Sequence, residues 1–234
     1  MEIKHEIYYD KEKTKPVTDY KVDDDGYAII GSGIWYVYGD TDVFAFNDAR
    51  VYAFDDSRVL AYDNSEVRAY NNSSVSAHYD SMVKTYNDSL VYAYDNSRVY
   101  AHGNSEVFAI NEARVFAHDN SNIFAHDQSN VYAYDKSDIV ATQRSFVKAY
   151  GNSCVNAGGD SNVVPLGNSK VYGYQNSIIH VHGDGTPTVF ITDNSSIRAT
   201  SDVWEKAIYE KKSYPENYTK FTLNQSVNTS KNPS

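Results

Sequence analysis

Residues 95–102 read DNSRVYAH and residues 103–110 read GNSEVFAI. Both follow one pattern: Asp, Asn or Gly, a second polar residue, Ser, a variable residue, Val, a variable residue, Ala and a large side chain. The pattern runs without a slip from residue 31 to residue 182, which makes about 19 octapeptide units. A two-residue insertion follows Gly183, and one more unit is recognisable at 195–199. A short repeat of this kind predicts a fold built by stacking identical units.

Within each unit the pattern has a period of two. Small or β-branched residues alternate with variable ones, which is typical of a strand, and the polar residues at each junction are typical of a turn. One short strand cannot bury its own face, so successive units must stack. The sequence therefore predicts an all-β fold, a single-chain β-solenoid with coils about 4.8 Å apart.

The two sides of each predicted strand have different compositions. Ser57, Val59 and Ala61 occupy alternate positions, and the same three residue types recur at these positions in almost every unit. The positions between them hold charges of both signs, such as Arg58 and Glu66, beside Tyr and Phe. Charges of both signs do not line a dry core. We therefore expect the Ser, Val and Ala rows to face inward.

The number of units in one coil follows from core volume and from the glycine spacing. Rows of Ser, Val and Ala fill the thin slot between two apposed sheets, whereas a triangle of three units per coil would contain voids. Multiples of 16 separate five turn glycines: Gly39, Gly103, Gly151, Gly167 and Gly183. A spacing of 24 separates three histidines: His78, His102 and His126. We expect a two-sided solenoid with two units, or about 16 residues, per coil and about nine or ten coils.

Both ends of a solenoid need a cap, because bare sheet edges would polymerise. Trp204 and Ile208 are spaced i, i+4 and would give a short helix an apolar face against one open end. The predicted organisation is an N-terminal cap at 1–30, the solenoid at 31–200, a C-terminal cap with this helix at 201–223, and a disordered tail at 224–234.

The octads DNSRVYAH (95–102) and DNSEVRAY (63–70) resemble the DNSxVxAY arrays of uncharacterised bacterial and phage proteins. The resemblance covers about two thirds of the chain, and it implies a repeat architecture without a defined activity. The periodicity of 8 and 16 is also similar to that of bacterial ice-nucleation repeats. Those repeats present Thr-x-Thr rows outward, whereas the outward positions here hold rings and charges.

Composition excludes several classes of protein. The 234 residues carry a net charge of −10, which argues against general nucleic-acid or anionic-membrane binding. No run approaches 18 apolar residues, and residues 1–15 lack the apolar region of a signal peptide. We therefore expect a cytoplasmic protein or, if a phage encodes it, one in the host cytoplasm or the phage particle. Cys154 stands alone, so the chain has no disulfide framework.

Catalytic signatures are missing from the sequence. It contains no G-x-S-x-G, P-loop, G-x-G-x-x-G or HExxH motif, and its serines belong to the repeat. We predict a protein that is not an enzyme and that needs no cofactor and no metal.

Rows of outward rings are the leading candidate for function. Stacked one coil apart, they stabilise a sheet, and a contiguous aromatic patch is also unusual on a monomer and typical of interfaces. We expect a protein-binding scaffold or inhibitor, and an aromatic face could also pair two copies of the chain into a homodimer. The predicted partner-binding residues are Tyr92, Tyr94, Tyr100, Phe108, Phe116, Phe124, Tyr132 and Tyr134.

Two other functions fit parts of the sequence. Residues 1–64 carry 14 acidic and seven basic residues, so their net charge is −7, and they could imitate DNA to inhibit a nucleic-acid-handling enzyme. The acidic patch of this alternative is Asp23, Asp24, Asp25, Asp40, Asp48, Asp55, Asp56 and Asp63. Aromatic platforms could instead stack on sugar rings, or the rod could self-assemble as a structural protein.

The histidines take the same outward positions as the rings. With two units per coil, His102 and His118 are neighbours in one column, and His180 and His182 share one face. Two neighbouring imidazoles could bind a metal ion. A zinc site needs a third ligand, which no spacing supplies, and so we expect these histidines to extend the aromatic ladder.

Overall fold

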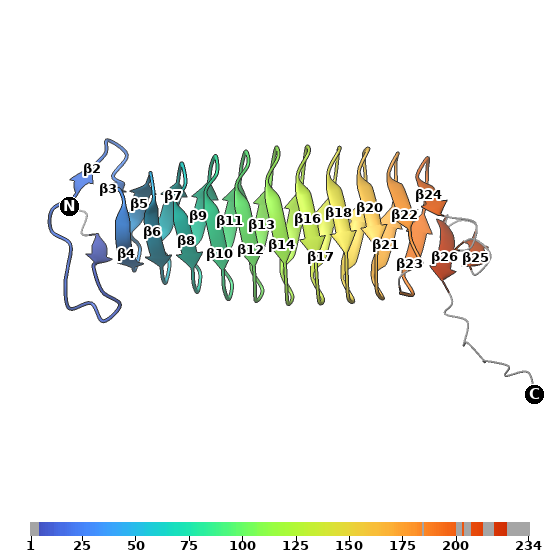
Figure 1. Cartoon of the computed structure of the whole chain (residues 1–234), viewed down its shortest axis with the longest axis horizontal. Coiled ribbons are helices and arrows are strands. Elements are labelled where there is room, and N and C mark those ends of the chain that lie inside the picture. Colours follow the sequence, from blue (N-terminus) through green and yellow to red (C-terminus); the bar gives the residue numbers. More distant parts are fainter. Residues whose placement is uncertain (1–4, 184, 200–202, 204–206, 213–217, 224–234) are drawn as a thin grey trace, which may run out of the picture.

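The computed structural model is an elongated rod in which short strands stack along the long axis, with turns along both sides (Figure 1). It describes residues 5–183, 185–199, 203, 207–212 and 218–223. No helix in these ranges is long and apolar enough to cross a membrane.

Two sheets face each other along the rod. The 12-stranded sheet contains, in spatial order, β1 (Glu6–Tyr8), β4 (Gly33–Tyr38), β6 (Ala49–Ala53), β8 (Glu66–Ala69), β10 (Met82–Thr85), β12 (Arg98–Ala101), β14 (Arg114–Ala117), β16 (Asn130–Ala133), β18 (Phe146–Ala149), β20 (Asn162–Pro165), β22 (Ile178–Val181) and β24 (Ser196–Ala199).

The 14-stranded sheet takes the alternate strands. It contains β2 (Lys21–Val22), β3 (Ala28–Ile30), β5 (Asp42–Ala45), β7 (Arg58–Ala61), β9 (Ser74–Ala77), β11 (Leu90–Ala93), β13 (Glu106–Ala109), β15 (Asn122–Ala125), β17 (Asp138–Ala141), β19 (Cys154–Ala157), β21 (Lys170–Gly173), β23 (Thr188–Ile191), β26 (Tyr218–Leu223) and β25 (Ala207–Lys212).

The strand register confirms the two-sided coil. Val83 pairs in parallel with Val99, and Val91 with Val107, so equivalent residues in neighbouring coils are 16 apart. The described part of the chain makes about 11 such turns. This exceeds the expected nine or ten, because β3 before the uninterrupted repeat and β23 and β24 after it also stack in parallel on the rod. The histidine spacing of 24 therefore does not correspond to a coil.

The predicted insertion widens one coil without breaking the stack. Lys170 pairs with Thr188, and Ile179 pairs with Ile197, so the interval between paired residues is longer by two here than in the central coils. The extra length is accommodated in the turn between β22 and β23, and the strands keep their alignment. The unit predicted at 195–199 forms β24.

The inward rows are the ones expected. Val99, Ala101 and Ser97 have no exposed surface, and the same holds for the corresponding residues of almost every central unit. The interior is therefore a narrow slab of small side chains from two apposed sheets. Serines border this slab, and Ser121, Ser137 and Ser153 donate hydrogen bonds to the carbonyl three positions earlier, at 2.8–2.9 Å.

Turns begin at the first residue of each unit, and its conformation explains the residue type. Asp119 and Asp135 have φ angles of 58° and 56°, in the left-handed region where Asp, Asn and Gly cost least. Their carboxylates accept hydrogen bonds from the backbone N–H of the same position one coil earlier, as between Asp119 and Gly103 at 3.0 Å. An acidic first residue thus both permits the turn and ties neighbouring coils together.

The N-terminal cap closes one end with antiparallel strands. β1 pairs with β4, and the segment around Pro16 covers the outer side of β1, where the N–H of Val17 donates to the carbonyl of Ile7 at 2.9 Å. Proline has no N–H to offer a further strand, which protects this edge.

The C-terminal cap differs from the predicted helix in most of the part that is described. Val203 is helical and buried, but residues 207–212 and 218–223 form an antiparallel hairpin, β25–β26, and β26 pairs with β23 to extend the 14-stranded sheet. The helix prediction is therefore wrong for Ile208, which lies in β25. A new strand satisfies the edge backbone groups of β23, which a packed helix would leave unpaired. Trp204 and the tail at 224–234 lie outside the described residues.

Candidate interaction surfaces

The predicted partner-binding rings lie on two opposite surfaces. Strands of consecutive units alternate between the sheets, so rings eight positions apart in sequence point in opposite directions. Tyr100, Phe116 and Tyr132 lie on the outer face of the 12-stranded sheet, on β12, β14 and β16. The outer face of the 14-stranded sheet carries Tyr92, Phe108 and Phe124, on β11, β13 and β15.

Each set forms a compact column. Ring centroids are 4.9 Å apart for Tyr100 and Phe116 and 5.1 Å for Phe116 and Tyr132, with planes within 11° of parallel. The opposite column has spacings of 5.1 and 4.8 Å. The rings are half-buried, because each covers the flat face of its neighbour. A partner therefore meets ring edges and tyrosine hydroxyls, because neighbouring rings cover most of the flat ring faces.

The turns that come directly after the strands of the 12-stranded sheet lie along one side of the rod (Figure 1), and we call them the first turn row. A longer ladder of stacked rings runs along this row. Neighbouring rings are 4.7–5.5 Å apart throughout. The ladder contains Tyr38, Phe54, Tyr70, Tyr86, His102, His118, Tyr134 and Tyr150. Tyr94 lies in the shorter ladder of the opposite row, stacked on His78 at 4.8 Å.

Cations lie over the rings at the ends of several columns. The guanidinium of Arg68 is 5.0 Å from the ring centre of Tyr52, and the ammonium of Lys84 is 6.0 Å from that of Tyr100. Each cation occupies the position that the next ring would take. Cation–π attraction of about 0.5–1 kcal/mol at such exposed sites makes them suitable column ends.

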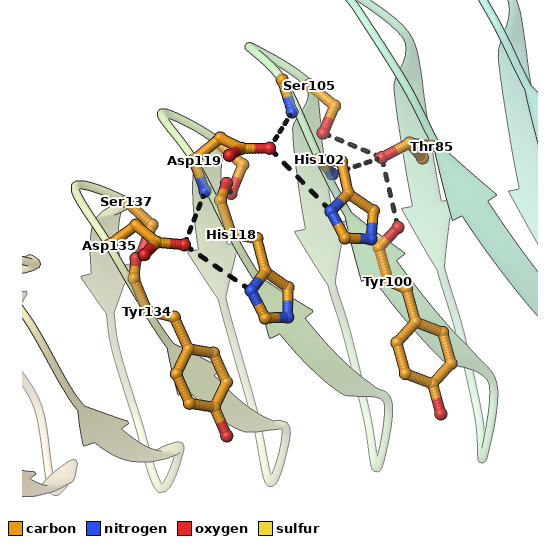
Figure 2. Close-up of polar contacts among 11 residues, drawn as sticks. Thr85, Tyr100, His102, Ser105, His118, Asp119, Tyr134, Asp135 and Ser137 are labelled. Carbon is orange, nitrogen blue, oxygen red and sulfur yellow. Dashed lines mark hydrogen bonds and ion pairs between the residues drawn. The ribbon is translucent and has the colours of Figure 1, made fainter.

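Two histidines in the first turn row each face an aspartate (Figure 2). The Nδ1 atom of His102 is 3.9 Å from an oxygen of Asp119, and that of His118 is 3.7 Å from an oxygen of Asp135. These carboxylates are already held by backbone N–H groups in the turns. The pairs therefore repeat with the coil, and they become ion pairs when the imidazoles are protonated.

The stacked geometry does not suit a metal shared by His102 and His118. Their ring centroids are 5.0 Å apart and their planes differ by 11°. Nitrogen lone pairs lie in the ring planes, so those of two parallel rings run side by side and do not converge on one ion. The part of the chain that the structure describes contains no group of three or more His, Cys, Asp or Glu placed to hold a metal.

Burial governs the protonation of His102 and His78. Desolvation in the ladder lowers the pKa of His102, and the neighbouring His118 lowers it further, against the opposing effect of Asp119 and Asp135. Burial also lowers the pKa of His78, with Asp95 opposing. Stacking between neighbouring rings thus favours the neutral imidazole of these two histidines, because it removes water from the ring.

The predicted acidic patch does not form one surface. Asp40, Asp55 and Asp56 lie in the first turn row, whereas Asp48 and Asp63 lie in the turns on the opposite side of the rod. Asp23, Asp24 and Asp25 form the turn between β2 and β3 in the cap, where Asp23 accepts a hydrogen bond from the N–H of Tyr27 at 2.7 Å. Several of these carboxylates are therefore engaged in turn structure.

Comparison with protein-family models, with curated proteins and with solved structures gives no match. Sequence reasoning found the rings themselves but not their division between two faces. The signal was present in the repeat, because units of odd and even number belong to different sheets once the coil contains two units.

Proposed function

We propose that this chain is a non-catalytic protein-binding scaffold or inhibitor that contacts its partner through stacked Tyr and Phe rings. One observation carries the proposal. Each of β12, β14 and β16 holds one outward ring and is followed by another ring immediately before the turn. The column of Tyr100, Phe116 and Tyr132 therefore adjoins the rungs His102, His118 and Tyr134.

This surface has the properties of a preformed binding site. The rings are held by their stacked neighbours, so little side-chain freedom remains to be lost on association. Tyrosine offers apolar area and a hydroxyl from a stiff side chain, which is why it is frequent among energetically dominant interface residues. The flat array suits a protein surface better than a small molecule, which needs a concave site.

Paired substitutions test the proposal. The tagged chain is used to capture partners from bacterial lysate after nuclease treatment, and captured proteins are quantified by mass spectrometry. We expect Tyr100→Ala with Phe116→Ala, or Tyr92→Ala with Phe108→Ala, to lose a stoichiometric partner. The matched control is Tyr36→Ala with Tyr52→Ala, a stacked pair on the 12-stranded sheet that lies outside β12, β14 and β16. Retention of the partner by both test pairs, with unchanged circular dichroism, would contradict the proposal.

A further inference from the structure

The two outer faces differ in charge, although the same octapeptide builds both. On β6 to β24 of the 12-stranded sheet, seven basic residues face outward against the single carboxylate of Glu66: Arg50, Arg68, Lys84, Arg98, Arg114, Lys148 and Arg198. On β5 to β23 of the 14-stranded sheet, two basic residues face three acidic ones: Arg58 and Lys170 against Asp42, Glu106 and Asp138.

This cationic face lies within a chain whose net charge is −10. The acidic excess is therefore concentrated elsewhere, mainly in the two turn rows, where Asp is the preferred first residue. Although the net charge is negative, the outer face of the 12-stranded sheet therefore carries a basic strip, which is as wide as one strand and runs along the rod.

Arg98 and Arg114 are the most informative members of the strip. They are exposed and directly in register on β12 and β14, one coil apart. Like charges at such positions destabilise a sheet. At the same position elsewhere, the chain places opposite charges in register: Arg58 contacts Asp42 at 2.6 Å, and Arg50 lies 3.8 Å from Glu66.

Among the described residues, no carboxylate lies within 4.0 Å of the guanidinium of Arg98 or Arg114. The two arginines line a surface cavity together with Asp80 and Glu112 from the neighbouring turns. Both carboxylates lie more than 4.0 Å from the guanidinium groups, which is beyond ion-pair distance. On their other side, the two arginines adjoin the column of Tyr100 and Phe116. Two neighbouring guanidiniums beside stacked rings are a local conflict of the kind that functional sites retain.

We propose that the partner binds this face of the 12-stranded sheet, and that it does so with an acidic polypeptide segment whose carboxylates pair with Arg98 and Arg114. The inference rests on the proposed function and specifies its face and its partner. Arginine pairs with carboxylates in a bidentate manner, and Arg and Tyr together are frequent at interface centres. Outward ring edges carry positive partial charge, which also favours carboxylate oxygens.

Nucleic acid fits the strip less well. A duplex is wider than one short strand and would overlap the turn rows, where Asp80, Asp95, Asp119 and Asp135 repel phosphate. A single strand gains much of its affinity from bases stacked on exposed ring faces. Here neighbouring rings cover those faces.

Binding of a defined acidic probe tests the inference. A fluorescein-labelled poly-glutamate peptide is titrated with the full chain at low salt, and anisotropy is recorded. We expect R98E with R114E to weaken binding about tenfold or more, because two attractive charges become repulsive. K136E with R144E is the matched control, with the same change in net charge at exposed turn residues, and it should change binding less than about twofold.

Other outcomes would overturn the inference. Equal losses in both double variants would show that only the overall charge matters. Tighter binding of a single-stranded oligothymidylate of equal length, dependent on Arg98 and Arg114, would assign the strip to nucleic acid. If Tyr92→Ala with Phe108→Ala loses the lysate partner while R98E with R114E keeps it, the partner uses the opposite face. The proposed function would then stand and this inference would fail.

A stability measurement supplies an independent check. R114Q alone removes one of the two like charges in register without adding a carboxylate beside Glu112, so we expect a higher thermal midpoint together with weaker peptide binding. A lower midpoint would show that the two arginines are not in conflict, which would remove the main argument for their role.

Discussion

The inner and outer sides of the same strands differ in how freely their residues vary. On β12, Val99 and Ala101 have no exposed surface, and their equivalents recur in almost every coil. Arg98 and Tyr100 alternate with them, and their positions hold Glu, Met, Lys, Phe or Asn in other coils of the same sheet. The inner side meets an equivalent strand across a narrow slab, so its volume is fixed. The outer side meets solvent and one neighbour above and below, so its chemistry is free to vary.

This contrast assigns the fold to the inward residues of each strand and the function to the outward residues that alternate with them. Substitutions on the inner side should lower the stability of the whole rod, whereas those on the outer side should affect binding and leave the rod intact. The turns form a third class, because their left-handed first residues are restricted in backbone conformation but not in burial.

The largest effect is expected from a charge on the inner side. Val115→Asp buries a carboxylate among apolar side chains, and we expect a loss of about 4 kcal/mol or more in the free energy of unfolding. Asn130→Asp places the same group on the outer side, one coil from Arg114. It should change stability by less than about 0.5 kcal/mol. Urea unfolding followed by circular dichroism measures both variants. Similar losses in the free energy of unfolding would refute the contrast between the inner and outer sides.

An intermediate effect is expected from a turn. Gly103 has a φ of 73°, and an added Cβ would lie 2.8 Å from the backbone nitrogen of Asn87 in the neighbouring coil. Gly103→Ala should therefore cost about 1–3 kcal/mol. Gly183→Ala is the control, because its nearest neighbour would be 3.9 Å away and no left-handed φ is required. A thermal midpoint for Gly103→Ala as high as that of the control would show that the coils can separate at little cost.

The smallest effect concerns pH and the outer ladder. The pKa values of His78, His102 and His180 are lowered by burial in the folded chain. The unfolded chain, with an imidazole pKa of about 6.5, therefore takes up protons first as the pH falls. Stability should be full above this value and decline as the pH falls through it toward the folded pKa. His102→Tyr should weaken this decline in urea midpoints measured on both sides of that value, and a midpoint that rises with acidification would contradict it.

Much of the fold follows from the octapeptide alone. The period of two within each unit predicts strands, the small inward residues favour two units per coil over three, and the turn residues mark each corner. The register of Val83 with Val99 confirms the two-unit coil. The helix prediction around Ile208 was wrong because it considered only the spacing of a few apolar residues. It did not consider that the edge strand β23 needs a hydrogen-bonded partner strand, which β26 supplies.

The candidate surface was predictable only in part. The rings were evident, but Tyr92 and Tyr100 look like members of one cluster in the sequence and lie on opposite faces in the fold. The charge difference between the faces likewise appears only when the residues of odd and even units are counted separately.

The sequence by itself determined the strand length, the inward rows and the turn chemistry, because each depends on neighbours within one unit. Only the tertiary structure decided which side chains share an outer face: it places Tyr92 and Tyr100 on opposite sheets and, within the part of the chain that it describes, leaves the adjacent Arg98 and Arg114 without a carboxylate in ion-pair contact. The division between faces is a property of the stacked coils, because consecutive units join different sheets and each outer face is assembled from alternate units.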